Sequence, residues 1–190
     1  MVVSPHADAL RTAHRYQGDS NDCGPYVVTT IVNALQGLHL EPAQVAEAMN
    51  QPAWRGRRPV VRRVPGWASF PWGLVDILGR FGLTARWRAR ARVAELVPAL
   101  EQGWVLVPFL GGWRPWPPWG HVAVLVAHSP NDVPDYGPDH SPEDGPRGWG
   151  MVDPMTRTNE LYWRSEADFS ARWRALGNLL VEVAPPRHST

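Results

Sequence analysis

The first half of the chain places hydrophobic residues at the three- and four-residue spacing that amphipathic helices require. Over residues 24–38, valine, isoleucine and leucine follow this spacing, and Pro25 stands near the start, where a missing N–H costs little. The pattern therefore predicts a buried helix that begins at Cys23. The same spacing predicts two further helices, over residues 42–50 and 71–81.

The second half shows the patterns of strands. Residues 104–110 and 121–128 are continuous apolar runs flanked by glycine and proline, as in central strands that are buried on both faces. Strict alternation over residues 84–92, with arginine on one face, predicts another strand. Further strands are expected at residues 149–152 and 179–183.

Two helices are expected among these strands. One covers residues 93–102, and the other begins at Ser165, where Ser165 and Asp168 form a capping-box pattern. Helices still dominate the N-terminal half and strands the C-terminal half, so the fold class is predicted to be α+β. The length of 190 residues suits a single domain over residues 1–190.

Three segments are expected to be loops, because proline and glycine recur in all of them. Residues 51–67 are rich in arginine and proline and are interpreted as a surface excursion. Residues 110–120 and the insertion at residues 129–148 are longer than a connection requires, which often indicates a functional role.

The composition excludes several classes of protein. Hydrophobic residues make up 44% and charged residues 19%, so the chain is neither disordered nor collagen-like. The formal charge of +1 gives no global field to hold a nucleic acid or an anionic membrane. The sequence shows neither a signal-peptide pattern nor an apolar run of about 18 residues, so we expect a soluble, cytoplasmic protein without a membrane span.

The single cysteine, Cys23, carries the most informative chemistry. One cysteine excludes an internal disulfide and makes a structural zinc site improbable, so neither a metal nor another cofactor is expected. At the first turn of a helix, unpaired N–H groups and the helix dipole favour a thiolate, which makes Cys23 a candidate nucleophile. The alternative is a buried cysteine packed as a small hydrophobic residue, but polar residues precede it on the N-terminal side.

A thiolate nucleophile needs an imidazole partner, and seven histidines are available. His121 opens an apolar run directly after Gly120, where a fixed strand end can aim it. His128 lies seven residues further on, roughly 23 Å away along a strand and on the opposite face, so the two cannot serve one site. His14, close in sequence to Gln17, remains the second choice.

Two further residues complete the candidate site. Asp153 ends a predicted strand and is followed by Pro154, so its carboxylate can orient the imidazole if the two strands are antiparallel neighbours. Turn chemistry is the ordinary interpretation of such an Asp-Pro pair. The Gln17 side chain can supply an amide N–H to a developing oxyanion, together with the backbone N–H of Cys23.

Three motifs taken together resemble a known family. Gln17-x4-Asp22-Cys23-Gly24, then Gly120-His121-Val-Ala-Val, then Val152-Asp153-Pro154 are similar to the papain-like cysteine peptidases. The likeness is greatest to the branch of bacteriocin-processing, double-glycine leader peptidases and their stand-alone relatives. It spans roughly residues 14–155.

The resemblance implies a papain-like fold, in which an N-terminal helical half packs against a C-terminal antiparallel sheet and the catalytic core covers about residues 14–184. It also implies Cys23 as nucleophile, His121 as general base and acid, Asp153 as the residue that orients the imidazole, and Gln17 as oxyanion donor. The expected reaction is hydrolysis of a peptide or amide bond in a peptide or protein substrate, through a thioester.

The tract before His121 is a candidate substrate-binding wall. Trp113, Trp116 and Trp119 alternate with prolines and lead into Gly120, so their indoles can line the cleft. The competing interpretation is that these rings cover the sheet edge.

Other functions are compatible with the same residues. The triad could transfer acyl or amide groups instead of hydrolysing them, or a catalytically silent relative could use the cleft to bind peptides. Two arginine groups are local positive patches, although solvated surfaces are the simpler interpretation and nucleic acid is not an expected partner. These groups are Arg86, Arg88, Arg90 and Arg92, and Arg55, Arg57, Arg58, Arg62 and Arg63.

Overall fold

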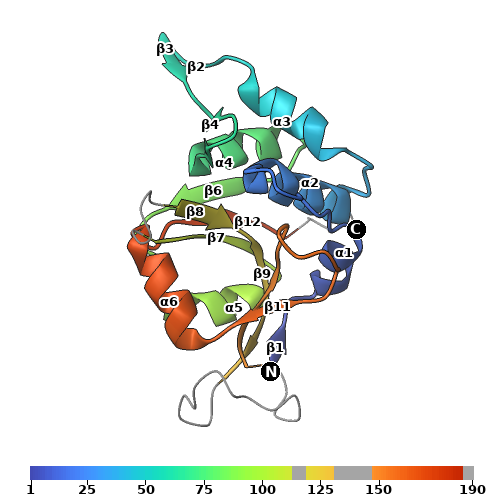
Figure 1. The fold of residues 1–190 in the computed structure, drawn as a ribbon, viewed down its shortest axis with the longest axis vertical. Coiled ribbons are helices and arrows are strands. Elements are labelled where there is room, and N and C mark those ends of the chain that lie inside the picture. Colours follow the sequence, from blue (N-terminus) through green and yellow to red (C-terminus); the bar gives the residue numbers. More distant parts are fainter. Residues whose placement is uncertain (113–118, 131–146, 186–190) are drawn as a thin grey trace.

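The computed structural model describes residues 1–112, 119–130 and 147–185, apart from the side chain of Arg55. Its centre is an eight-stranded antiparallel sheet with the main order β11-β10-β9-β7-β12-β6, to which β1 adds beside β9 and β8 beside β7 (Figure 1). The strands are β1 (Val2–Val3), β6 (Ala85–Arg88), β7 (Val105–Gly112), β8 (Trp119–Val122), β9 (Val124–Ser129), β10 (Gly148–Val152), β11 (Tyr162–Arg164) and β12 (Leu180–Val183).

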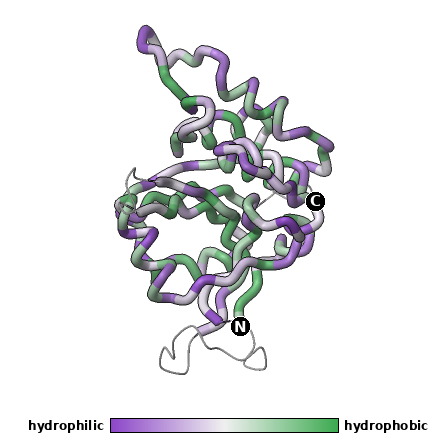
Figure 2. Tube along the Cα trace, viewed as in Figure 1, coloured by the Kyte–Doolittle hydropathy of each residue, from purple (hydrophilic) through white to green (hydrophobic). Residues whose placement is uncertain are grey.

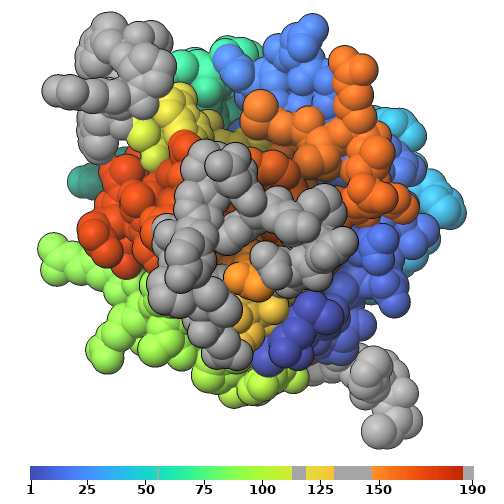
Figure 3. All heavy atoms as spheres, turned by 60° about the horizontal axis from the view of Figure 1, so that its bottom comes forward, coloured from blue at the N-terminus to red at the C-terminus, as the bar shows by residue number. Residues whose placement is uncertain are grey.

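Helices cover both faces of this sheet. On one face pack α1 (Ala7–Thr12), α2 (Cys23–Gln36) and α4 (Pro71–Arg80), with α3 (Pro42–Asn50) lying against α2 and α4. On the other face lie α5 (Leu96–Glu101), which follows the short helix η1 (Val93–Glu95), and α6 (Glu166–Ala175). On that side of the molecule the dark-blue β1 lies beside the light-green α5 (Figure 3).

The period of two in the central strands explains the two faces. In β7, Val105 and Val107 join the core under α2, whereas Leu106 and Leu110 join the core under α5 and α6. Figure 2 shows the hydrophobic residues concentrated along these inner strands. Each fully buried side chain of this kind contributes about 1.5–3 kcal/mol. The predicted α+β class, with an N-terminal helical half against an antiparallel sheet, is confirmed.

The predicted helices are present within a few residues of their expected ends. The helix expected over residues 24–38 is α2, which begins at Cys23 and ends before Gly37, a left-handed residue with φ of 63°. The cap predicted at Ser165 is formed, because the Ser165 hydroxyl accepts a hydrogen bond from the Asp168 N–H at 3.2 Å.

Two strand predictions need correction. The strand expected over residues 84–92 ends at Arg88, because Arg90 adopts a left-handed conformation (φ 58°) and its N–H bonds to the Gly177 carbonyl, which turns the chain away. The run at residues 121–128 is divided at Ala123 into β8 and β9.

The loop predictions also need correction. The predicted loop at residues 110–120 is shorter, because β7 continues to Gly112 and β8 begins at Trp119. The expected surface excursion at residues 51–67 contains strands. One small sheet joins β2 (Ala53–Arg55) to β3 (Arg58–Val60), and a second joins β4 (Arg63–Val64) to β5 (Ala68–Ser69). Arg62 and Arg63 are buried rather than solvated.

Candidate active site

Cys23 is the first residue of α2 and is half-buried at the edge of the core. The preceding residue, Asp22, occupies the N-cap position but makes no side-chain capping bond. The third helical position is Pro25, which has no N–H to be capped. The backbone N–H groups of Cys23 and Gly24 therefore remain unpaired donors within the described part of the chain.

The Asp22 carboxylate forms an ion pair with a buried arginine, Arg63. Asp22 Oδ1 lies 2.5 Å from Nη2 of Arg63, whose side chain is only 4% exposed. The Nη1 of Arg63 has no hydrogen-bond partner within the described residues. Because the pair engages Asp22, it holds the residue before the thiol in place and keeps its carboxylate off the helix N-terminus.

The hairpin formed by β4 and β5 makes two further contacts with this segment. The Asn21 side chain donates a hydrogen bond to the Gly66 carbonyl at 3.1 Å. A Cβ atom at Gly24 would lie 2.3 Å from Oγ of Ser69, so only glycine permits β5 to approach the first turn of α2. The segment around Cys23 and this hairpin therefore form one packed unit.

His121 and Asp153 come together from two different strands. His121 lies in β8, and Asp153 follows β10, whose last residue Val152 pairs with Val124 of β9. Nε2 of His121 and Oδ1 of Asp153 are 2.9 Å apart, and both side chains are almost fully buried. β10 pairs with β9 rather than with β8, so Asp153 reaches His121 from the neighbouring strand.

The imidazole of His121 also interacts with Cys23. Burial alone would lower the pKa of His121. Hydrogen bonds to Asp153 and Cys23, and the charge interactions with both residues, have a larger opposite effect and raise the pKa of His121 to about 9. Because Nε2 bonds Asp153, Nδ1 is the ring nitrogen left for the sulfur. The His121 bond in turn lowers the pKa of the Asp153 carboxyl, against the opposing effect of burial, so that Asp153 is ionised at neutral pH.

His14, the second choice as imidazole partner of Cys23, bonds the main chain of Asp153 instead. Its Nε2 donates a hydrogen bond to the main-chain carbonyl of Asp153 at 3.0 Å. The same carbonyl accepts bonds from the N–H and the hydroxyl of Thr156, and Oδ1 of Asp153 accepts from the Met155 N–H at 2.8 Å. His14 therefore lies behind Asp153 and contributes to its support.

Gln17 is buried next to the same segment. Its N–H bonds to the Pro154 carbonyl at 2.8 Å, and its side-chain Nε2 donates to the Ser20 carbonyl at 2.6 Å. An amide nitrogen carries two hydrogens, so one remains after the bond to Ser20. Gln17 thus links the loop before Cys23 to the turn after Asp153.

Trp119 and Gly120 form the part of the predicted wall that the structure describes, since Trp113 and Trp116 lie outside the described residues. The Trp119 indole packs directly on Gly112 of β7, where a Cβ atom would lie 2.7 Å from Nε1. The Arg172 guanidinium stands 5.0 Å from the Trp119 ring centroid. Gly120 is exposed directly before His121.

Sequence reasoning missed Arg63 and Thr156. The segment around Arg63 is rich in arginine and proline, which predicts a solvated surface, and the partner of Arg63, Asp22, lies 41 residues away. Thr156 follows the Asp-Pro turn, and a Ser or Thr hydroxyl in such a turn is a local signal for a bond to the backbone.

The described residues show neither a metal cluster nor a spanning helix. No group of three or more His, Cys, Asp or Glu side chains within these ranges is arranged to hold a metal ion. In the same ranges, every helix is too short or too polar to cross a lipid bilayer.

Comparison with known proteins identifies the fold. No protein-family model matches the chain, and no curated protein matches its sequence at a significant level. Among solved structures, one from Bacillus anthracis, described as a "putative C39-like peptidase", matches with a TM-score of 0.65 at 12% sequence identity. The match covers 98% of this chain and 98% of that one. The chain therefore has the fold of this C39-like peptidase, and the expected papain-like peptidase fold is confirmed.

Proposed function

We propose that the protein is a cysteine peptidase that hydrolyses peptide or amide bonds with Cys23, His121 and Asp153. The observation that carries the proposal is the buried imidazole of His121, which interacts with the Cys23 sulfur and bonds the Asp153 carboxylate at 2.9 Å. The fold shared with the C39-like peptidase supports the same class of activity at a coarser level.

In the proposed resting state, His121 holds the proton and Cys23 is the thiolate. The raised pKa of His121, about 9, favours this ion pair at neutral pH. The sulfur attacks the carbonyl carbon of the substrate, and the C–O double bond becomes a tetrahedral oxyanion. The unpaired N–H of Cys23 and the remaining amide hydrogen of Gln17 are the proposed donors to this oxygen.

Collapse of the intermediate completes acylation. The C–N bond breaks, His121 gives its proton to the leaving amine, and a thioester remains on Cys23. Water then loses a proton to His121 and attacks the thioester, which releases a carboxylic acid and restores the thiolate–imidazolium pair. Asp153 keeps the imidazole oriented through both steps.

The proposal is tested by treating a library of peptides with the wild type and with the variants Cys23→Ala and His121→Gln. We expect the wild type to cleave a subset of peptides at new termini, and both variants to lose at least about 10³-fold in rate. Mass spectrometry of the products distinguishes hydrolysis from transfer of the acyl group to an amine.

A thiol-labelling experiment provides the control. With the thiolate held by His121, we expect iodoacetamide to alkylate Cys23 rapidly below pH 7, and slowly in His121→Gln until about pH 8.5. Cleavage that persists in Cys23→Ala would exclude this nucleophile. Absence of cleavage, together with slow alkylation of the wild type, would indicate a peptide-binding module instead.

A further inference from the structure

Charge is distributed very unevenly along this nearly neutral chain. Residues 51–92 contain ten arginines and one acidic residue, Asp76, a formal charge of +9. The other 148 residues contain nine arginines and seventeen acidic residues, a formal charge of −8. All basic residues of the chain are arginine and none is lysine. This preference does not explain the uneven charge, because it does not determine where the acidic residues lie.

Some arginines of this segment are neutralised within the fold. Arg62 bonds Asp76, and Arg63 bonds Asp22. Arg86 and Arg88 share the buried carboxylate of Glu182. By contrast, Arg57, Arg58 and Arg90 are exposed and have no ion-pair partner within the described residues.

Tryptophans with exposed surface accompany these free guanidinium groups. Trp54 and Trp67 are about two-thirds exposed, at 65% and 67%, and Trp87 is 40% exposed. Trp72 lies 6.0 Å from the Trp87 ring centroid and also stacks on Phe70. Rings of this size at the surface are typical of recognition sites rather than of solvated faces.

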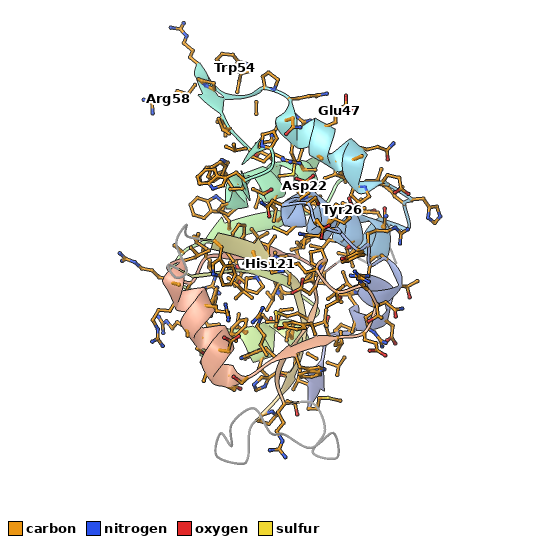
Figure 4. All side chains as sticks on the ribbon, in the orientation of Figure 1. Asp22, Tyr26, Glu47, Trp54, Arg58 and His121 are labelled. Atoms are coloured by element: carbon orange, nitrogen blue, oxygen red, sulfur yellow. The ribbon has the colours of Figure 1, made fainter. Side chains whose placement is uncertain are left out.

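We call these surface residues, taken together, the Arg–Trp face. It is made of Arg57, Arg58, Arg90, Trp54, Trp67, Trp72 and Trp87. The Trp72 indole donates a hydrogen bond to Val61 beside the β2–β3 hairpin, and α4 packs on β6. Figure 4 shows Trp54 and Arg58 projecting from that hairpin, at the top of the view, with His121 near the middle.

One residue of the Arg–Trp face, Trp67, lies close to the proposed active site. Trp67 lies in the turn between β4 and β5, directly after Gly66, whose carbonyl accepts the bond from Asn21. Ser69 of β5 touches Gly24, the residue after the nucleophile. A peptide that leaves the site along this hairpin would therefore reach Trp67.

We propose that the Arg–Trp face binds an acidic segment of the peptide substrate, at a distance from the bond that is cleaved. This inference rests on the proposed function and names the substrate class. Carboxylates of the segment pair with the free guanidinium groups, and its apolar side chains pack on the indoles. The three free arginines of this face could contact only a few phosphates, whereas nucleic-acid complexes with a steep salt dependence make about 6–10 such contacts.

The test measures binding rather than cleavage, so it stands apart from the proposed hydrolysis. Fluorescence anisotropy of the Cys23→Ala variant is recorded with a labelled peptide that alternates Glu and Leu, and with its twin in which Gln replaces Glu. At an ionic strength of about 0.15 M, we expect the Glu peptide to bind at least about tenfold more tightly.

Two substitutions locate the binding, and a third is their matched control. Arg58→Glu and Trp67→Ala each change an exposed side chain and should weaken binding of the Glu peptide by about three- to tenfold. Arg80→Glu makes the same charge change at the far end of α4, roughly 12 Å along the helix from Trp72, and should alter binding less than twofold.

Three results would overturn the proposal. The first is equal or absent binding of the Glu and Gln peptides, and the second is an equal loss in Arg58→Glu and Arg80→Glu. The third is tighter binding of oligothymidylate with a steep salt dependence, which would identify a nucleic-acid surface. If Cys23→Ala binds as expected while the wild type cleaves no peptide, the proposed hydrolysis fails and the acidic-peptide site stands.

Discussion

Asp153 is the most heavily bonded residue of the candidate site. Its carboxylate accepts bonds from the His121 ring and the Met155 N–H, and its carbonyl accepts bonds from His14 and Thr156. The side chain therefore has little freedom to turn away from His121. Two properties of Asp153, its charge and its ability to accept a hydrogen bond, can be separated by substitution.

Asp153→Asn removes the charge but keeps an oxygen that accepts the Nε2–H of His121. The Asp153 charge helps to raise the pKa of His121 to about 9, so we expect this pKa to fall in the variant. The alkaline limit of kcat/KM should move from near pH 9 to lower pH, and the maximal rate should fall by about tenfold or less.

Asp153→Ala is the matched variant, because it removes the acceptor as well. The buried Nε2 then loses its partner, and kcat/KM should fall by about 10²–10⁴-fold. The pH profiles of both variants are compared with that of the wild type. An unchanged alkaline limit in Asp153→Asn would contradict the role of this carboxylate.

His14 and His121 are distinguished by a second pair of substitutions. His14→Gln retains an N–H that can reach the Asp153 carbonyl, so kcat/KM should fall by less than about tenfold. His121→Gln removes the proton donor and acceptor, and the rate should fall by at least about 10³-fold. The reverse order would make His14 the base.

At the scale of elements, the start of α2 depends on close approach by the β4–β5 hairpin. Gly24→Ala would place a Cβ atom 2.3 Å from Oγ and 2.4 Å from Cβ of Ser69. We expect a loss of about 1–3 kcal/mol in the free energy of unfolding, measured with urea. Alkylation of Cys23 should also slow, because the shift displaces the first turn of the helix.

Gly79→Ala is the control for this substitution. Gly79 is also helical, but its Cβ atom would meet nothing within 4 Å, so alanine should stabilise α4 by about 0.5–1 kcal/mol. The double variant Gly24→Ala with Ser69→Gly removes the clashing side chain and should recover most of the stability. If the double variant stays as unstable as Gly24→Ala, the clash with Ser69 is not the cause of the lost stability.

The start of α2 also shows what the sequence could and could not predict at this scale. The spacing of hydrophobic residues and the place of Pro25 predict that α2 begins at Cys23, and in the structure α2 begins at this residue. The burial of Arg63 does not follow from neighbouring residues, since it depends on an ion pair with Asp22 across 41 positions. The early end of β6 likewise depends on a bond from Arg90 to Gly177.

At the scale of the whole molecule, the buried His121 couples folding to pH. Its folded pKa lies above the value of 6.5 that it has when unfolded, so the folded state binds its proton more tightly. The stabilisation is fully present below pH 6.5 and is lost as the pH rises through the folded value. Cys23→Ala is the suitable background, because it removes titration of the thiol.

In that background, we expect the free energy of unfolding to fall by about 1–3 kcal/mol between pH 6.5 and 9, since Asp153 still holds the imidazolium. Adding His121→Gln should abolish this slope. The measurement is a urea titration at several pH values. A slope that survives in the double variant would assign the effect to another group.

The buried central strands of the molecule could be predicted from the sequence pattern, whereas the contacts between distant segments could not. Continuous apolar runs at residues 104–110 and 121–128 predicted strands buried on both faces, and β7 and β9 have this arrangement. The interaction of His121 with Cys23 was not visible from spacing, because it requires β8 and α2 to meet across 98 positions. Motif order supplied that expectation, whereas local periodicity did not.

The arrangement of Cys23, His121 and Asp153 has a consequence for the newly synthesised chain. The three groups belong to α2, β8 and the turn after β10, so the imidazole cannot meet both partners until the middle of the sheet is assembled. A nascent chain that ends before residue 153 therefore lacks the carboxylate that bonds His121. Under the proposed mechanism, Cys23 becomes fully reactive only when the fold is complete, so synthesis itself delays hydrolysis.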